Sequence, residues 1–189
     1  VRVRGLHFAK LCGLYAVHSR LCDPSFAHLP SALWCLLRRY TDVQGGEGLS
    51  GAEAHAAVAE KGFVALSTLL GVEMEAFASP LNCFFSRFCS AQTDVDLPFG
   101  SLGSFYSFRP KKGSFQVNPP FTTTDFKKTA VHCISLLSRA QEEGKPLSFA
   151  ICLPNWNDPI PYGIKLLLDS EFCTTKKESD AKEKRSAHV

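Results

Sequence analysis

The hydrophobic positions of the first 40 residues follow the spacing of amphipathic helices. Between residues 6 and 40 they recur mostly three or four positions apart, which places them on one face of a helix: Leu11, Leu14, Tyr15 and Val17, then Leu33, Trp34, Leu36 and Leu37. Pro24 and Pro30 interrupt this stretch, and a proline inside a helix removes a backbone hydrogen bond. The pattern therefore predicts two helices joined by a turn.

A third helix is predicted after a glycine-rich loop. Residues 44–51 (QGGEGLSG) contain four glycines, a composition typical of a flexible connection. The helix is expected from about residue 52 to residue 70. Ser50 suits its N-cap, and Gly71 stands where a glycine commonly ends a helix.

From Val72 onward the pattern changes to strands that alternate with helices. Strands are predicted over 72–78, 114–117 and 147–153, and helices over 83–89, 124–143 and 162–170. The segment 92–113 is predicted as loops with one short strand. Because LSFAICL at 147–153 is almost entirely apolar, we expect that strand to be covered on both faces.

This alternation is typical of an α/β protein with a parallel, doubly wound sheet. We therefore expect a helical segment over residues 1–70 and an α/β core over residues 71–172. The lysine-rich tail over residues 173–189 is expected to be solvated or disordered.

Composition narrows the class of protein. Of the 189 residues, 45% are hydrophobic and 21% are charged, as in an ordinary globular domain, and the net charge of +3 permits nucleic-acid contact without predicting it. The eight cysteines are scattered without a CxxC pair, which favours free thiols in an intracellular protein over disulfides or a zinc site. No metal site is predicted. No apolar run is long enough to predict a membrane span.

The most informative motif is NPPF, residues 118–121, directly after the second predicted strand. It suits methylation of the exocyclic amine of adenine, a weak nucleophile that must be held in line with a methyl donor. Two acceptors can hold its two N–H bonds: the side-chain carbonyl of Asn118 and the backbone carbonyl of Pro119. Pro119 and Pro120 restrict the backbone, and Phe121 can stack on the purine. The structural alternative is a rigid Pro-Pro turn in which Phe121 only packs.

Small residues at two other turns suit a cofactor, S-adenosylmethionine. The turn after the first predicted strand and a later small-residue loop allow close backbone approach, and an acidic side chain can bind the ribose. The residues chosen for this role are Ala78, Ser79, Pro80, Asn82, Gly100, Ser101 and Asp96. A proline-bounded turn and a solvated acidic loop are the structural alternatives.

Three residues are candidates for contacting a nucleic-acid substrate. Trp156 follows the last predicted strand and can stack on a base, while Arg39 and Lys112 each belong to a basic pair that can bind phosphates. Ordinary surface lysines and arginines and a structural tryptophan give the same pattern. The histidines form no spacing typical of a catalytic triad or a metal site.

Four segments in order resemble the phosphorylated-CTD-interacting-factor family: FASPLNCFFSRFCSA at 77–91, FGSLG at 99–103, GSFQVNPPF at 113–121 and LSFAICLPNW at 147–156. The resemblance implies a Rossmann-like class I methyltransferase core with a helical domain before it. It also implies N6-methylation of the cap-adjacent 2′-O-methyladenosine of mRNA in the nucleus, with Asn118, Pro119, Pro120 and Phe121 holding the adenine. Longer members also bind the phosphorylated tail of RNA polymerase II through a WW domain, which we do not expect in this chain.

The end of the chain departs from the family pattern. The resemblance implies further strands after Phe172, where this sequence continues as TTKKESDAKEKRSAHV. We therefore expect a sheet that lacks its last strands and leaves an edge exposed. Three functions stay open: a cap adenosine methyltransferase, an adenine methyltransferase acting on other RNA or DNA, and a non-catalytic protein that keeps the fold to bind RNA or a partner.

Overall fold

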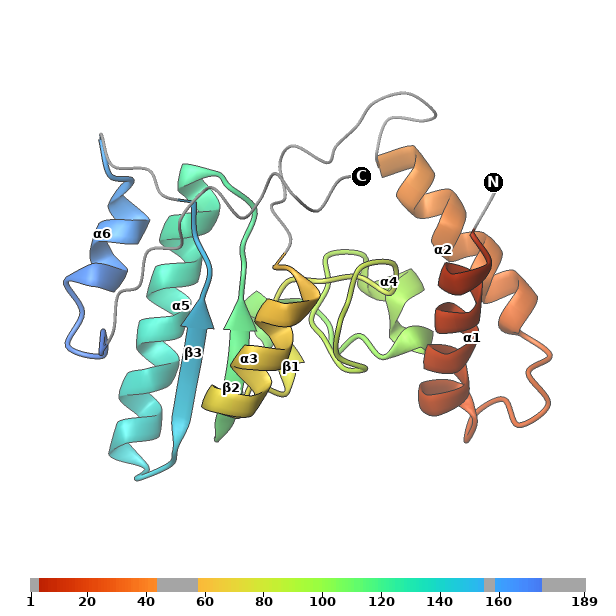
Figure 1. Cartoon of the computed structure of the whole chain (residues 1–189), viewed down its shortest axis with the longest axis horizontal. Coiled ribbons are helices and arrows are strands. Elements are labelled where there is room, and N and C mark those ends of the chain that lie inside the picture. Colours follow the sequence, from red (N-terminus) through yellow and green to blue (C-terminus); the bar gives the residue numbers. More distant parts are fainter. Residues whose placement is uncertain (1–3, 44–57, 155–158, 175–189) are drawn as a thin grey trace.

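The computed structural model describes residues 4–43, 58–154 and 159–174, and its helical and strand elements are shown in Figure 1. Helices α1 (Gly5–Ser19) and α2 (Leu29–Val43) confirm the two predicted N-terminal helices. Asp23 fixes the turn between them, since its carboxylate accepts hydrogen bonds from the Tyr15 hydroxyl and from the backbone N–H groups of Ala27 and His28. These bonds satisfy two N–H groups of the turn that leads into α2.

Helix α3 (Glu60–Leu70) begins later than predicted. Residues 58 and 59 are not helical, and Ser50 lies outside the part of the chain that the structure describes. The predicted end is confirmed: Gly71 has a left-handed backbone (φ 64°), and its N–H donates to the Ser67 carbonyl. Glycine adopts this conformation without steric cost.

The sheet is parallel, as predicted, and contains three strands in the order β1-β2-β3. They are β1 (Met74–Glu75), β2 (Gly113–Val117) and β3 (Leu147–Ile151). Two single-residue bridges extend the sheet beyond β1, from Glu75 to Phe88 and from Phe88 to Ser101. The first predicted strand is therefore much shorter than residues 72–78.

The helix predicted over residues 83–89 is wrong. The backbone N–H groups of Phe84 and Phe85 donate to the buried carboxylate of Glu75, at 2.6 and 3.0 Å, instead of to helical carbonyls. Phe88 then pairs with β1. The following segment, predicted as loops, also contains α4 (Thr93–Asp96) and two turns of 3₁₀ helix, η2 (Leu97–Phe99) and η3 (Phe105–Ser107).

Helices α5 (Thr123–Glu142) and α6 (Tyr162–Leu168) match the predictions for the C-terminal half. Thr122 caps α5, because its hydroxyl oxygen accepts the Asp125 N–H at 3.0 Å. The two helices lie side by side next to β3 (Figure 1). Gly163 permits this approach, because a Cβ there would lie 2.3 Å from the Phe126 carbonyl carbon.

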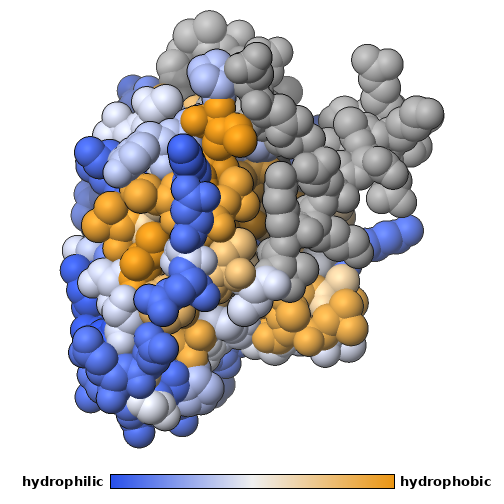
Figure 2. All heavy atoms as spheres, turned by 90° about the vertical axis from the view of Figure 1, so that its left-hand side faces the viewer, coloured by the Kyte–Doolittle hydropathy of each residue, from blue (hydrophilic) through white to orange (hydrophobic). Residues whose placement is uncertain are grey.

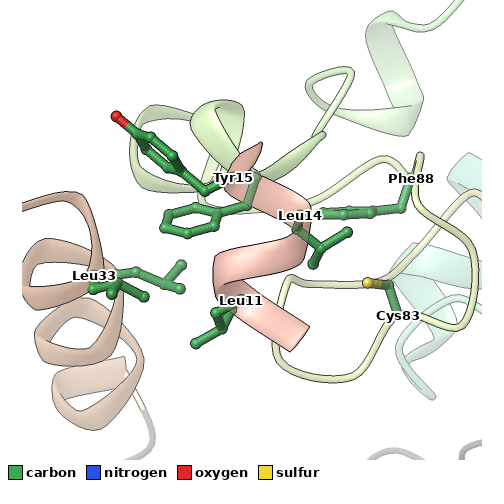
Figure 3. Packing of buried hydrophobic residues seen from close by; sticks show 8 residues of the cluster. Leu11, Leu14, Tyr15, Leu33, Cys83 and Phe88 are labelled. Atoms are coloured by element: carbon green, nitrogen blue, oxygen red, sulfur yellow. The ribbon is translucent and has the colours of Figure 1, made fainter. Parts of the chain in front are cut away.

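Two hydrophobic clusters form the interior. The first joins α1 and α2 to the segment after β1, and Leu11, Leu14 and Tyr15 lie between Leu33 and Phe88 in Figure 3. The second lies between the sheet and α5. Its buried members are Met74, Ala76, Cys89, Phe105, Phe115, Val117 and Cys133.

Strand β3 is less buried than predicted. Its alternating residues Leu147, Phe149 and Ile151 pack against the second cluster, but every residue of β3 is at least partly exposed. The reason is its position, since β3 is the last strand of the sheet formed by the described residues. An outer strand has a neighbour on one side only. None of the described helices is long and apolar enough to cross a membrane.

Candidate functional site

The carboxyl ends of the three strands meet at one edge of the sheet, the position where open α/β sheets bind ligands. Hydrogen bonds continue one residue beyond the strands there. The Ala76 N–H donates to the Gln116 carbonyl at 2.7 Å, and the Cys152 N–H donates to the Val117 carbonyl at 2.8 Å. The segment after β1 and the NPPF motif after β2 are thereby held at the same edge, as predicted.

The NPPF motif leaves this edge as a well-supported turn. Pro119 is buried, while Asn118, Pro120 and Phe121 are half-buried and so remain accessible from one side. The Pro120 carbonyl accepts the Thr122 N–H at 2.8 Å, which ties the turn to the cap of α5. The Phe121 ring lies 6.3 Å from the Phe126 ring of α5. The motif thus presents an amide and an aromatic ring from a fixed backbone.

An aromatic group that the sequence did not reveal packs with the second hydrophobic cluster, between the sheet and α5. The Phe77 ring lies 5.1 Å from Phe105 and 5.7 Å from Tyr106. The Tyr106 hydroxyl contacts Asp125 at 3.2 Å and Thr129 at 3.3 Å on α5. Burial raises the pKa of Tyr106 to about 12, so this phenol stays protonated. No spacing rule connects Phe77 with Tyr106, because a turn and an irregular segment separate them.

The turn after β1 is closed by its own side chains. The Asn82 side-chain oxygen accepts the Ser79 N–H at 2.7 Å and the Ser79 hydroxyl at 3.0 Å. Ser79 and Pro80 are buried, whereas Ala78 is half-buried and Asn82 is exposed. Of the residues predicted here for the cofactor, Ala78 and Asn82 are therefore the accessible ones, and Ser79 and Pro80 shape the turn beneath them.

Gly100 serves the packing of α1. Its backbone is left-handed (φ 105°), and a Cβ would lie 2.5 Å from both His18 Nε2 and the Ser86 carbonyl oxygen. The absent side chain therefore makes room for His18, which the sequence could not show. Next to it, the Ser101 hydroxyl is buried and lies 2.7 Å from the Ser90 hydroxyl.

Asp96 does not reach an open surface. Its side chain is fully buried, and Oδ2 accepts the Tyr40 hydroxyl at 2.7 Å. Burial raises the pKa of this carboxyl above its usual range. A carboxylate enclosed in this way cannot contact a ribose without rearrangement, so its placement does not support the predicted cofactor role.

The two described residues that were predicted to contact substrate, Arg39 and Lys112, are engaged or placed elsewhere. Arg39 forms a bidentate ion pair with Asp94, at 3.0 and 2.7 Å, and also donates to Gln92. Lys112 precedes β2 and therefore lies at the opposite edge of the sheet. Trp156 lies outside the described residues.

The thiols offer no metal site in the part of the chain that the structure describes. No group of three or more histidine, cysteine, aspartate or glutamate side chains there is placed to hold a metal ion. Burial raises the thiol pKa of Cys83 to about 11 and those of Cys89 and Cys133 to about 12. These cysteines are therefore protonated packing residues.

Comparison with known proteins agrees with the motif. A sequence model of the family described as "Phosphorylated CTD interacting factor 1 WW domain" matches residues 10–188. The chain is 38% identical over 172 residues to a human mRNA (2′-O-methyladenosine-N(6)-)-methyltransferase and 37% identical to the mouse protein of the same name. Each alignment covers 91% of this chain and 24% of the relative, so the chain spans about a quarter of the length of these relatives.

The match to the family model covers most of the helices and all three strands of the sheet. It also contains NPPF and the FASPLN segment, on which the resemblance rested. The chain belongs to the phosphorylated CTD interacting factor 1 family.

Proposed function

We propose that this protein transfers a methyl group from S-adenosylmethionine to N6 of adenosine in RNA, with the cap-adjacent 2′-O-methyladenosine of mRNA as its target. The observation that carries the proposal is the position of Asn118-Pro119-Pro120-Phe121 at the carboxyl end of the central strand β2. The names of the human and mouse relatives support the choice of target. The parallel sheet with flanking helices is consistent with a Rossmann-like methyltransferase core.

Asn118 and Phe121 would carry the recognition of adenine. The Asn118 side-chain oxygen accepts one N–H of the exocyclic amine, and the Pro119 carbonyl accepts the other. Phe121 stacks on the purine and sets its depth. With both hydrogens held, the nitrogen lone pair is directed at the incoming methyl carbon, so the chain contributes mainly orientation. The capped turn from Pro120 to Thr122 keeps these groups in place before the substrate binds.

The turn after β1 lies at the same carboxyl edge of the sheet as NPPF, and its residues suit a small cofactor. Ala78 is half-buried and has no bulky side chain, and the Ser79–Asn82 hydrogen bonds keep the turn fixed. Bound against this turn, S-adenosylmethionine would supply the electrophilic methyl group. Ala78 and Asn82 are the residues of this chain that we expect to contact it.

The test is methyl transfer from labelled S-adenosylmethionine to three substrates: capped RNA that begins with 2′-O-methyladenosine, the same RNA without a cap, and DNA. We expect transfer to the capped RNA. Asn118→Ala should lower kcat/KM about a hundredfold or more, because it removes a hydrogen bond that positions the reacting group. Gln141→Ala, which removes an exposed amide at the far end of α5, is the control and should keep full activity. Equal transfer to uncapped RNA would exclude cap specificity.

A non-catalytic role is the second candidate, and the partial exposure of β3 favours it. An outer strand with exposed residues is suited to pairing with another polypeptide. If the folded protein neither transfers methyl groups nor binds S-adenosylmethionine in calorimetry, this second function replaces the first.

A further inference from the structure

A surface groove runs along the first half of α5, next to the NPPF motif. Its volume is about 990 Å³. One face of α5 forms the floor, from Thr123 to Ser135, and Tyr106 and Tyr162 also line the groove. We refer to it as the α5 groove. None of the residues assigned above to adenine or cofactor binding lines it.

The α5 groove begins where NPPF ends. Thr123 and Thr124 line its first part, and they follow Phe121 after a single intervening residue. They also belong to the first turn of α5, a helix of 20 residues. The amino-terminal end of such a helix carries a partial positive charge. A polymer whose adenine lies on Phe121 therefore has its next nucleotides within reach of this groove.

The charges in the α5 groove suit a polyanion. Lys127 and Lys128 are exposed and line it, and no aspartate or glutamate of the described residues does. Asp125, the nearest acid along α5, is engaged by the hydroxyl groups of Thr122 and Tyr106. His132, whose ring lies beside Tyr106, has a lowered pKa because of burial and the neighbouring Arg109, and stays neutral at physiological pH.

The α5 groove also offers apolar surface of the kind that bases use. The Tyr162 side chain is 62% exposed, and Lys127 Nζ lies 5.9 Å from the centre of its ring. Val131 on the floor is 54% exposed. Figure 2, which views the molecule from the side of α6, shows hydrophobic and hydrophilic residues interspersed on that face of the molecule. Aromatic rings beside lysines are the usual means of binding single strands without sequence preference.

We propose that the α5 groove binds the single-stranded RNA attached to the target adenosine, with Lys127 and Lys128 on phosphates and a base stacked on Tyr162. This inference rests on the proposed function for the identity of the polymer, because RNA is the substrate named for the relatives. It adds a binding site for nucleotides that the NPPF motif does not contact.

The test is fluorescence anisotropy with a labelled oligouridylate of about ten nucleotides at low salt. This probe contains no adenine and no cap, so its binding depends on neither NPPF nor methyl transfer. We expect the double variant Lys127→Glu/Lys128→Glu to raise the Kd at least tenfold and to reduce the slope of log Kd against log salt by about one unit or more. Tyr162→Ala should raise the Kd about fivefold or more, because a stacked base is lost.

Lys145→Glu is the matched control, since Lys145 is an exposed lysine at the far end of α5. It should bind oligouridylate like the unchanged protein. Two results would overturn the groove proposal: no binding of oligouridylate by the unchanged protein, or an equal loss in Lys145→Glu and the double variant. Circular dichroism of each variant separates these results from unfolding. If the unchanged protein binds oligouridylate but transfers no methyl group to capped RNA, the proposed function alone is contradicted.

Discussion

At the scale of single residues, Gly100 was predicted to bind the cofactor, and the structure shows that it serves packing. A side chain there would need a left-handed backbone and would collide with the His18 ring and the Ser86 carbonyl, both at 2.5 Å. We expect Gly100→Ala to lower the free energy of unfolding by about 3 kcal/mol, from backbone strain and overpacking together. Urea denaturation measures this loss.

Gly71→Ala is the matched control for Gly100→Ala. Gly71 also has a left-handed backbone (φ 64°), but no atom lies within 4 Å of its would-be Cβ. Only the conformational cost applies, about 1 kcal/mol. Equal losses in the two variants would show that the contact with His18 contributes nothing.

These two glycines also show what the sequence can predict about single residues. Gly71 was correctly placed at the end of a helix, because the signal is local. The role of Gly100 depends on His18, which is 82 positions earlier in the chain. Likewise, the position of NPPF after a strand followed from the neighbouring sequence, whereas the burial of Asp96 against Tyr40 did not.

At the scale of elements, the contact between α5 and α6 depends on Gly163. A Cβ at this position would lie 2.3 Å from the Phe126 carbonyl carbon and 2.4 Å from the Lys127 nitrogen, both backbone atoms of α5. We expect Gly163→Ala to push α6 away and to cost about 2 kcal/mol. Faster amide hydrogen exchange, confined to α6 and the facing part of α5, is the expected result.

Gly13→Ala is the control for this prediction, because Gly13 lies inside α1 with no atom within 4 Å of its would-be Cβ. It should stabilise the protein by about 0.5–1 kcal/mol, since alanine favours the helix. Because Tyr162 precedes Gly163, Gly163→Ala should also weaken oligouridylate binding. Unchanged exchange in α6 would contradict the role assigned to Gly163.

Elements with a clear period were predicted well. The hydrophobic face of α5, the strand before NPPF and the apolar run of β3 each carry a signal within their own residues. The helix predicted over residues 83–89 failed because Glu75, from another element, takes two of its backbone N–H groups. A partner nine or ten residues away is not visible in local periodicity.

At the scale of the whole molecule, two buried acids each connect separate parts of the fold. Glu75 joins β1 to the turn that carries Phe84 and Phe85, and Asp96 joins α4 to Tyr40 of α2. Burial raises the pKa of both carboxyls, and the backbone N–H groups around Glu75 offset this only in part. Both contacts depend on tertiary structure, which unfolding removes.

These raised pKa values make the folded state less stable as the pH rises. In the unfolded chain both acids titrate near their ordinary pKa of about 4, whereas the folded protein keeps their protons to higher pH. The folded state therefore binds more protons above about pH 4, and stability falls as the pH rises through the raised pKa values. Asp96→Asn keeps an acceptor for Tyr40 and removes the charge. We expect it to flatten this decline above about pH 4 in urea denaturation.

Asp94, two positions before Asp96, has a lowered pKa and therefore the opposite effect on stability. Its hydrogen bonds and ion pair with Arg39 lower the pKa of this carboxyl, so its contribution is present above about pH 4 and is lost as the pH falls. Asp94→Asn should therefore remove stability at neutral pH and leave it unchanged in strong acid. Two neighbouring aspartates should thus change the pH profile in opposite directions. If Asp96→Asn and Asp94→Asn shift the profile alike, the burial of Asp96 does not control its protonation.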